Sequence, residues 1–119
     1  MSEEKSLTPQ EAFNAVWQAF VVEKRPFGRD SIKCVYRGPN GERCAVGVLL
    51  RDEEYSRSME GCNVTTGAPF PPRFAESVVF LGRLQRIHDV NARNGDYTTL
   101  TDQLRALAWE YNLIIPAAA

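Results

Sequence analysis

The stretch IKCVYRGPNGERCAVGVLLRDEEY, residues 32–55, contains the clearest turn signal in the chain and two of its three cysteines. Residues 34–36 (CVY) favour a strand, because β-branched and aromatic side chains fit a pleated, half-buried surface. Residues 38–41 (GPNG) have the chemistry of a short hairpin loop. The pattern therefore predicts a β-hairpin in which Cys34 and Cys44 lie nearly opposite each other.

The apolar run CAVGVLL, residues 44–50, follows the turn. Its periodicity fits a buried strand as well as a short buried helix. We interpret it as a return strand to about Ala45, followed by a buried turn or short helix. Gly47 has no side chain to pack and is typical of a close approach by another backbone. The acidic residues 52–54 favour the start of a further helical turn, where carboxylates meet unpaired N–H groups.

Three other segments repeat apolar residues at the spacing of an amphipathic helix. The first starts at the capping box of residues 8–11 (TPQE) and ends before Pro26. The second covers residues 73–93 and is stopped by residues 94–95 (NG). The third starts at residues 99–102 (TLTD), where threonine and aspartate again favour a cap.

These patterns predict a small α+β fold with three amphipathic helices packed on a β-hairpin or small antiparallel sheet. A hairpin is too small to be stable alone and must pack on the helices. Residues 113–115 (LII) could add an edge strand. The 119 residues are predicted to form one domain, 1–119, with residues 1–6 and 117–119 flexible.

Composition excludes several classes of function. The net charge is −1, so no overall field attracts nucleic acid or an anionic membrane. No apolar run reaches the roughly 18 residues that a membrane-spanning helix needs. The polar start MSEEKSLTPQ is unlike a signal peptide, so we expect a cytoplasmic protein with reduced cysteines and no membrane partner.

His88 is the single histidine of the chain, which excludes zinc sites built on several histidines. Cys34, Cys44, Cys62 and His88 could together form a Cys₃His zinc site, although no close C-x₂₋₄-C pair is present. An enzyme or ligand binder using these groups with Asp89 is a second alternative. The simpler interpretation is that the cysteines are buried as small hydrophobes and that His88 is a structural residue on the inner face of its helix. The sequence predicts no catalytic residue and no cofactor.

Two neighbouring segments are candidate binding surfaces. The acidic segment, residues 52–60, could meet a basic partner or hold Mg²⁺. Its candidate binding residues are Asp52, Glu53, Glu54, Tyr55 and Glu60. The loop 61–72 is long enough to be a binding loop, and Phe70 within it either anchors the loop or is presented to a partner.

A third candidate surface is the arginine ridge, formed by Arg83, Arg86 and Arg93, with Arg73 earlier in the same predicted helix. Arginine favours planar, bidentate contacts, so the ridge could grip phosphates or an acidic protein patch. No aromatic residues alternate with these arginines, which argues against a single-stranded nucleic-acid surface. A solvated helix face is the alternative.

The pattern C-x-Y-R-x-x-x-G-x-x-C-A-V-G-x-L-x-x-D-x-x-Y-x-x-x-M-E-G spans residues 34–61, and L-x-R-L-Q-x-I-H-D spans residues 81–89. Together they resemble a loose set of short proteins of bacteria and their phages to which no activity is attached. The resemblance implies an interaction protein, for example a phage-encoded inhibitor of a host defence system.

The sequence thus predicts a small protein-binding module, monomeric or homodimeric, that acts by docking on a protein partner. The alternatives are the small enzyme or zinc binder using the cysteines, His88 and Asp89, and a nucleic-acid binder using the arginine ridge.

Overall fold

The computed structural model describes residues 5–27, 35–38, 41–66 and 69–116. Helix accounts for 59% of these residues and strand for 3%, with no sheet, so the fold is all-α and the predicted α+β class is wrong. The main helices are α1 (Pro9–Trp17), α2 (Ala45–Leu49), α3 (Val78–Ala92) and α4 (Tyr97–Glu110). The short helices are η1 (Gln18–Val22), η2 (Arg57–Met59), η3 (Val64–Thr66) and η4 (Pro72–Ser77).

The chain reverses where the hairpin is predicted, but no hairpin extends from the turn. Arg37 and Arg43 form a single antiparallel bridge, and the Gly38 N–H donates to the Glu42 carbonyl at 2.9 Å. The pairing then stops because Cys44 becomes the N-cap of α2, with its thiol accepting from the backbone of that helix. A helix uses its backbone groups internally, so they are not free to form a sheet ladder. Cys34, the predicted partner of Cys44, lies outside the described residues.

Gly47 marks a close backbone approach, as its position in the apolar run indicates. A Cβ built on Gly47 would lie 2.0 Å from the carbonyl oxygen of Tyr36. No side chain fits at that distance, so only glycine lets the segment at residues 35–38 lie against α2. The Cys44 N–H donates to the same Tyr36 oxygen at 3.4 Å.

The capping box at the start of α1 is confirmed. The Thr8 hydroxyl accepts from the Glu11 N–H at 3.1 Å, and the Glu11 carboxylate accepts from the Thr8 N–H at 3.0 Å. Beyond Trp17 the helix widens into the π-helical turn η1. η1 ends at Val22, and Lys24, whose φ of 51° is left-handed, follows it two residues before Pro26.

The stop signal and the third helix lie close to their predicted places. Gly95 adopts a left-handed φ of 60° after α3. The helix α4 then begins at Tyr97 with Asp96 as its N-cap, two residues earlier than predicted. The Asp96 carboxylate accepts from the Thr99 N–H at 2.9 Å, so Thr99 is the capped residue and not the cap.

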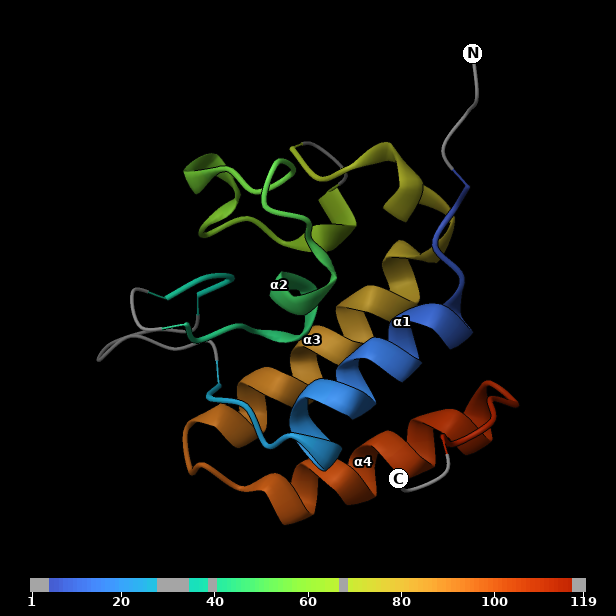
Figure 1. The fold of residues 1–119 in the computed structure, drawn as a ribbon. Helices are drawn as coiled ribbons and strands as arrows, with labels where there is room; N and C mark the ends of the chain where they lie inside the picture. Colours follow the sequence, from blue (N-terminus) through green and yellow to red (C-terminus); the bar gives the residue numbers. More distant parts are fainter. Residues whose placement is uncertain (1–4, 28–34, 39–40, 67–68, 117–119) are drawn as a thin grey trace.

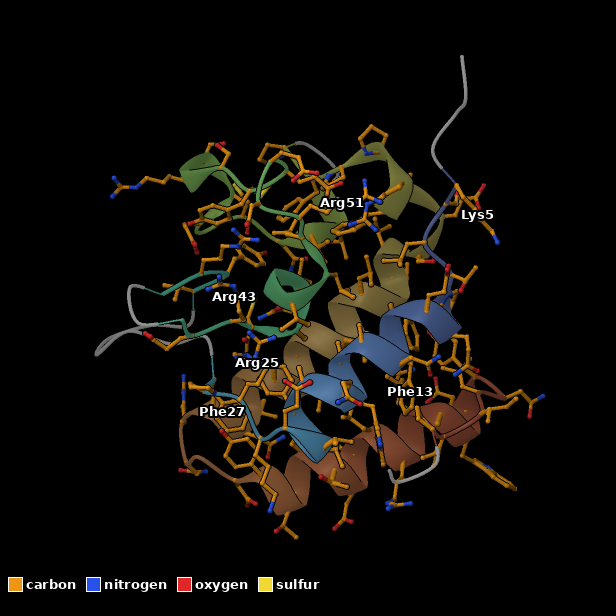
Figure 2. All side chains as sticks on the ribbon, in the orientation of Figure 1. Lys5, Phe13, Arg25, Phe27, Arg43 and Arg51 are labelled. Atoms are coloured by element: carbon orange, nitrogen blue, oxygen red, sulfur yellow. The ribbon has the colours of Figure 1, made fainter. Side chains whose placement is uncertain are left out.

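The core lies between α1, α3 and α4, with α2 packed against α1 and α3 (Figure 1). Phe13 of α1, labelled in Figure 2, stacks on Trp17 with ring centroids 5.7 Å apart. Among the fully buried side chains are Phe13, Phe20, Phe74, Leu81, Leu84 and Leu104. The apolar periodicity of the sequence therefore places the helix faces correctly.

Residues 113–115 do not add an edge strand. Ile114 is instead paired with the side-chain amide of Gln10 in α1. The Ile114 N–H donates to Gln10 Oε1 at 2.9 Å, and Gln10 Nε2 donates to the Ile114 carbonyl at 2.8 Å. Within the described ranges, every helix is too short or too polar to cross a membrane.

Candidate functional site

A recess of about 590 Å³ lies along α3, opposite the segment at residues 60–65. Residues 35–36 close one end of it. The residues of α3 that line it are Val79, Gly82, Arg83, Gln85, Arg86 and Asp89. The volume is in the range of about 300–1,000 Å³ that is usual for ligand sites.

Glu60 fixes the wall of the recess that faces α3. Its carboxylate accepts from the N–H groups of Tyr36 at 2.9 Å and Arg37 at 3.2 Å, and from the Tyr55 hydroxyl at 2.6 Å. The Tyr36 hydroxyl in turn donates to the Cys62 carbonyl. Burial raises the pKa of the Tyr36 phenol, which keeps this donor protonated. Polar contacts therefore hold the segment in place together with the buried side chains of Met59 and Val64.

Gly82 allows the segment to approach α3. A Cβ at this position would lie 3.1 Å from Cγ2 of Thr65, which is in η3. The absence of a side chain at Gly82 therefore lets η3 lie close to α3, and both Gly82 and Thr65 line the recess.

A chain of polar groups connects α2 to the floor of the recess. The Val46 N–H donates to Gln85 Oε1 at 3.0 Å, and Gln85 Nε2 donates to Asp89 Oδ1 at 2.6 Å. The same carboxylate oxygen lies 2.9 Å from Nδ1 of His88. His88 is 1% exposed and its ring packs against Phe20. This burial agrees with a structural histidine on the inner face of α3.

The arginine ridge divides into residues with different surroundings. Arg83 is paired with Glu110 and lies over the Tyr111 ring at 5.7 Å. Arg86 lines the recess, is exposed, and makes no ion pair with any described residue. Arg93 is exposed at the C-cap of α3 and is not among the lining residues.

Arg73 belongs to the interior and not to the ridge. Its guanidinium donates to both oxygens of Glu54 at 2.9 Å and to the Leu49 carbonyl at 2.6 Å. Hydrogen bonding to Arg73 lowers the pKa of Glu54 below its ordinary value. Glu54 also accepts from the Arg51 N–H at 2.8 Å.

The acidic segment does not form one acidic face. Asp52 is 91% exposed and is paired with Arg37 at 2.8 Å. Glu53 is exposed, whereas Glu54 and Glu60 are directed into the contacts described above. Residues 52–54 form a single hydrogen-bonded turn, in which the N–H groups of Glu54 and Tyr55 donate to the Arg51 carbonyl at 3.0 and 3.2 Å. The next helix, η2, is capped by Ser56.

Phe70 anchors its loop and is not presented to a partner. It is 7% exposed and packs edge-on against the Tyr36 ring, with centroids 5.4 Å apart. Tyr55, also in the predicted surface, is half-buried beneath the Arg37 guanidinium, which lies 5.0 Å from its ring centroid.

Of the two described cysteines, Cys44 lacks the features of a reactive thiol. Cys44 is fully buried, burial raises the pKa of its thiol, and its sulfur accepts from the Gly47 N–H at 3.2 Å. Cys62 is half-buried at the recess, and its thiol donates to the Ser58 carbonyl at 3.4 Å. In the described part of the chain, no three histidine, cysteine, aspartate or glutamate side chains are grouped to hold a metal ion. Cys34 lies outside that part.

Comparison of the chain with protein-family models, with curated proteins and with solved structures found no match. The geometry described above therefore carries the functional argument.

The sequence alone points to some of the residues that line the recess but not to others. Arg83, Arg86, Glu60 and the loop that follows Glu60 are among the predicted binding elements, and the structure brings them to one recess. Tyr36 and Gln85 were missed. Gln85 lies four residues before Asp89, a spacing that places both on one helix face, whereas nothing near Tyr36 in the sequence indicates its contact with Cys62.

Proposed function

We propose that the protein is a cytoplasmic docking module that binds a protein partner at the recess along α3 and performs no chemistry there. One observation carries the proposal. The recess gathers part of the arginine ridge, the end of the acidic segment and the loop after it, beside Val79, which is 68% exposed. Charged groups around an apolar centre have the arrangement of the polar rim and apolar core of a protein–protein interface.

The side chains capable of catalysis support docking over chemistry. Glu60 accepts three hydrogen bonds from groups that hold the recess wall. Asp89 is bonded to Gln85 and His88, and His88 is buried. A general acid or base must reach its substrate, and these groups are already occupied by structural contacts.

The charge distribution supports a protein partner over nucleic acid. Non-specific nucleic-acid binding depends on several cations that neutralise phosphates. Arg73 is buried against Glu54, and Arg83 is paired with Glu110. The ridge thus offers fewer free guanidinium groups than its sequence indicates, on a chain with a net charge of −1.

The test compares two aspartate substitutions on the same helix. Val79→Asp places a charge inside the recess, whereas Val90→Asp places one at a second exposed valine, 48% exposed, outside it. Wild-type protein and both variants are immobilised and exposed to a bacterial lysate, and each captured protein is then purified and its affinity measured. We expect a partner whose binding is lost with Val79→Asp and kept with Val90→Asp.

Thermal unfolding of both variants provides the control, and both should melt within a few degrees of the wild type, as surface substitutions usually do. A partner that binds folded Val79→Asp as tightly as the wild type would show that the recess is not the docking site.

A further inference from the structure

We infer that the recess binds a short, extended segment of the partner in which an apolar side chain and a carboxylate lie about three residues apart. The inference rests on the proposed docking function and specifies the chemistry of the occupant. Two features of the recess support it: the order of side chains along α3 and the unpaired charge of Arg86.

The order of side chains along α3 sets the spacing. Val79 and Arg86 both line the recess, with Gly82 between them. Seven residues of α-helix cover roughly 10 Å along the axis. An extended chain advances about 3.3 Å per residue, so about three residues of a bound segment cover the same length.

The charged residues of the recess determine which group of the partner segment binds at one end. Four charged residues line the recess: Glu60, Arg83, Arg86 and Asp89. The protein itself supplies partners to three of them, since Glu60 and Asp89 accept hydrogen bonds and Arg83 is paired with Glu110. Among the described lining residues, Arg86 is therefore the charged group whose side chain makes no hydrogen bond or ion pair with a described residue. A guanidinium in this position favours a carboxylate, which it can bind through two parallel hydrogen bonds.

The apolar residues set the chemistry at the other end. Val79 is 68% exposed although it lines the recess, so its side chain is available to a partner. Gly82 adds no side chain, and Val64 of η3 is buried behind it at 1% exposure. An aliphatic or aromatic side chain bound here would cover Val79 and remove apolar surface from water.

Asp89 determines on which side of Arg86 the carboxylate of the bound segment lies. It lies one turn beyond Arg86, so a carboxylate bound at the far end of the recess would meet a like charge. The bound carboxylate should therefore sit on the side of Arg86 that faces Val79. An acidic residue placed further along the segment would weaken binding.

The experiment uses a displayed library of random 12-residue peptides selected on the immobilised full-length chain. We expect the selected peptides to share an acidic residue about three positions from an apolar one. For a synthetic peptide of this kind, Arg86→Ala should weaken binding by about 10- to 100-fold, the effect of losing a charge-assisted contact. The matched control, Arg93→Ala, removes an exposed arginine of the same helix that lies outside the recess and should leave the affinity within about twofold.

Replacing the peptide's acidic residue by its amide should weaken wild-type binding similarly and should add little to Arg86→Ala, because the two changes remove one contact. Peptides that bind at the recess, as judged by Val79→Asp, but need no acidic residue would overturn this inference and leave the docking function intact. Peptides that bind equally to Val79→Asp would overturn both. Self-association of the chain that Val79→Asp abolishes would assign the recess to a second copy and also overturn the inference.

Discussion

The helical body and the segment at residues 50–77 differ in how much of their stability comes from polar contacts. In the body, α1, α3 and α4 bury apolar faces against one another. In the segment, no described helix is longer than the six residues of η4, and carboxylates and guanidinium groups make many of the contacts. The body is thus stabilised mainly by non-directional burial. The segment also buries Met59, Val64, Phe70 and Phe74, and it adds directional bonds to particular groups.

The recess lies where these two regions meet. Its α3 wall comes from the body, and its opposite wall comes from the polar segment. A rigid helix opposite a wall held by hydrogen bonds gives a site whose shape depends on a few polar side chains. A substitution in the segment can therefore change the shape of the recess without unfolding the body.

The largest effect is expected at Gly47 of α2, which lies against Tyr36. Tyr36 is in turn hydrogen-bonded to Glu60 and Cys62 of the segment. In Gly47→Ala the new Cβ meets the backbone oxygen of Tyr36, so α2 and residues 35–38 must separate. We expect a loss of about 3 kcal/mol in the free energy of unfolding, as for overpacking in a buried site. Chemical denaturation of the variant and of the wild type measures this difference in the free energy of unfolding.

Gly38→Ala is the matched control for that substitution. The atoms nearest to a Cβ at Gly38 are side-chain atoms of Glu42 at 2.9–3.0 Å, a milder clash than the one with the Tyr36 backbone oxygen at 2.0 Å. Equal losses in the two variants would show that the close approach of Tyr36 is not what makes Gly47 sensitive to substitution.

An intermediate effect is expected at Glu60. Glu60→Gln keeps the shape of the side chain but replaces a carboxylate that accepts three hydrogen bonds. We expect a loss of about 2 kcal/mol. Hydrogen exchange should accelerate at residues 50–77 and remain slow in α3 and α4. Glu53→Gln changes an exposed carboxylate of the same segment and should have no such effect. Uniform acceleration of hydrogen exchange in both regions would contradict the view that Glu60 stabilises the segment separately from the body.

The smallest effect is expected at the Glu54–Arg73 pair and depends on pH. The pKa of Glu54 is lowered on folding, so the pair stabilises the folded state above the ordinary value of 4.5 and loses this contribution as the pH falls through the folded value. Glu54→Gln should cost about 1 kcal/mol at neutral pH, and the difference from wild type should shrink below pH 4.5. Thermal unfolding across that range checks the prediction, and a difference independent of pH would contradict it.

The parts of the fold that the sequence predicts are those set by local chemistry. The capping box at Thr8 and the stop at Gly95 depend on neighbouring residues and form as expected. The hairpin was predicted wrongly from equally local signals. Its turn closes, but the apolar run after it fits a helix as well as a strand, and packing of α2 on α1 and α3 decides for the helix.

The candidate site was less predictable because three distant segments form it. Arg83 and Arg86 share one helix, so their proximity follows from spacing. The burial of Arg73 against Glu54 depends instead on where the polar segment folds, and this contact removes Arg73 from the ridge. Periodicity cannot show which charges find partners within the protein, and the unpaired charge at Arg86 became visible only in the structure.

The pairing of Gln10 with Ile114 has a consequence for the order of folding. The two residues are 104 positions apart, and the side-chain amide of one satisfies both backbone groups of the other. Such a contact closes most of the chain into a loop, which costs conformational entropy. Its net free energy therefore becomes favourable only after α1 and α4 are already packed. Ile114 is 77% exposed, so a small fluorescent label there would report the final docking step of folding without entering the core.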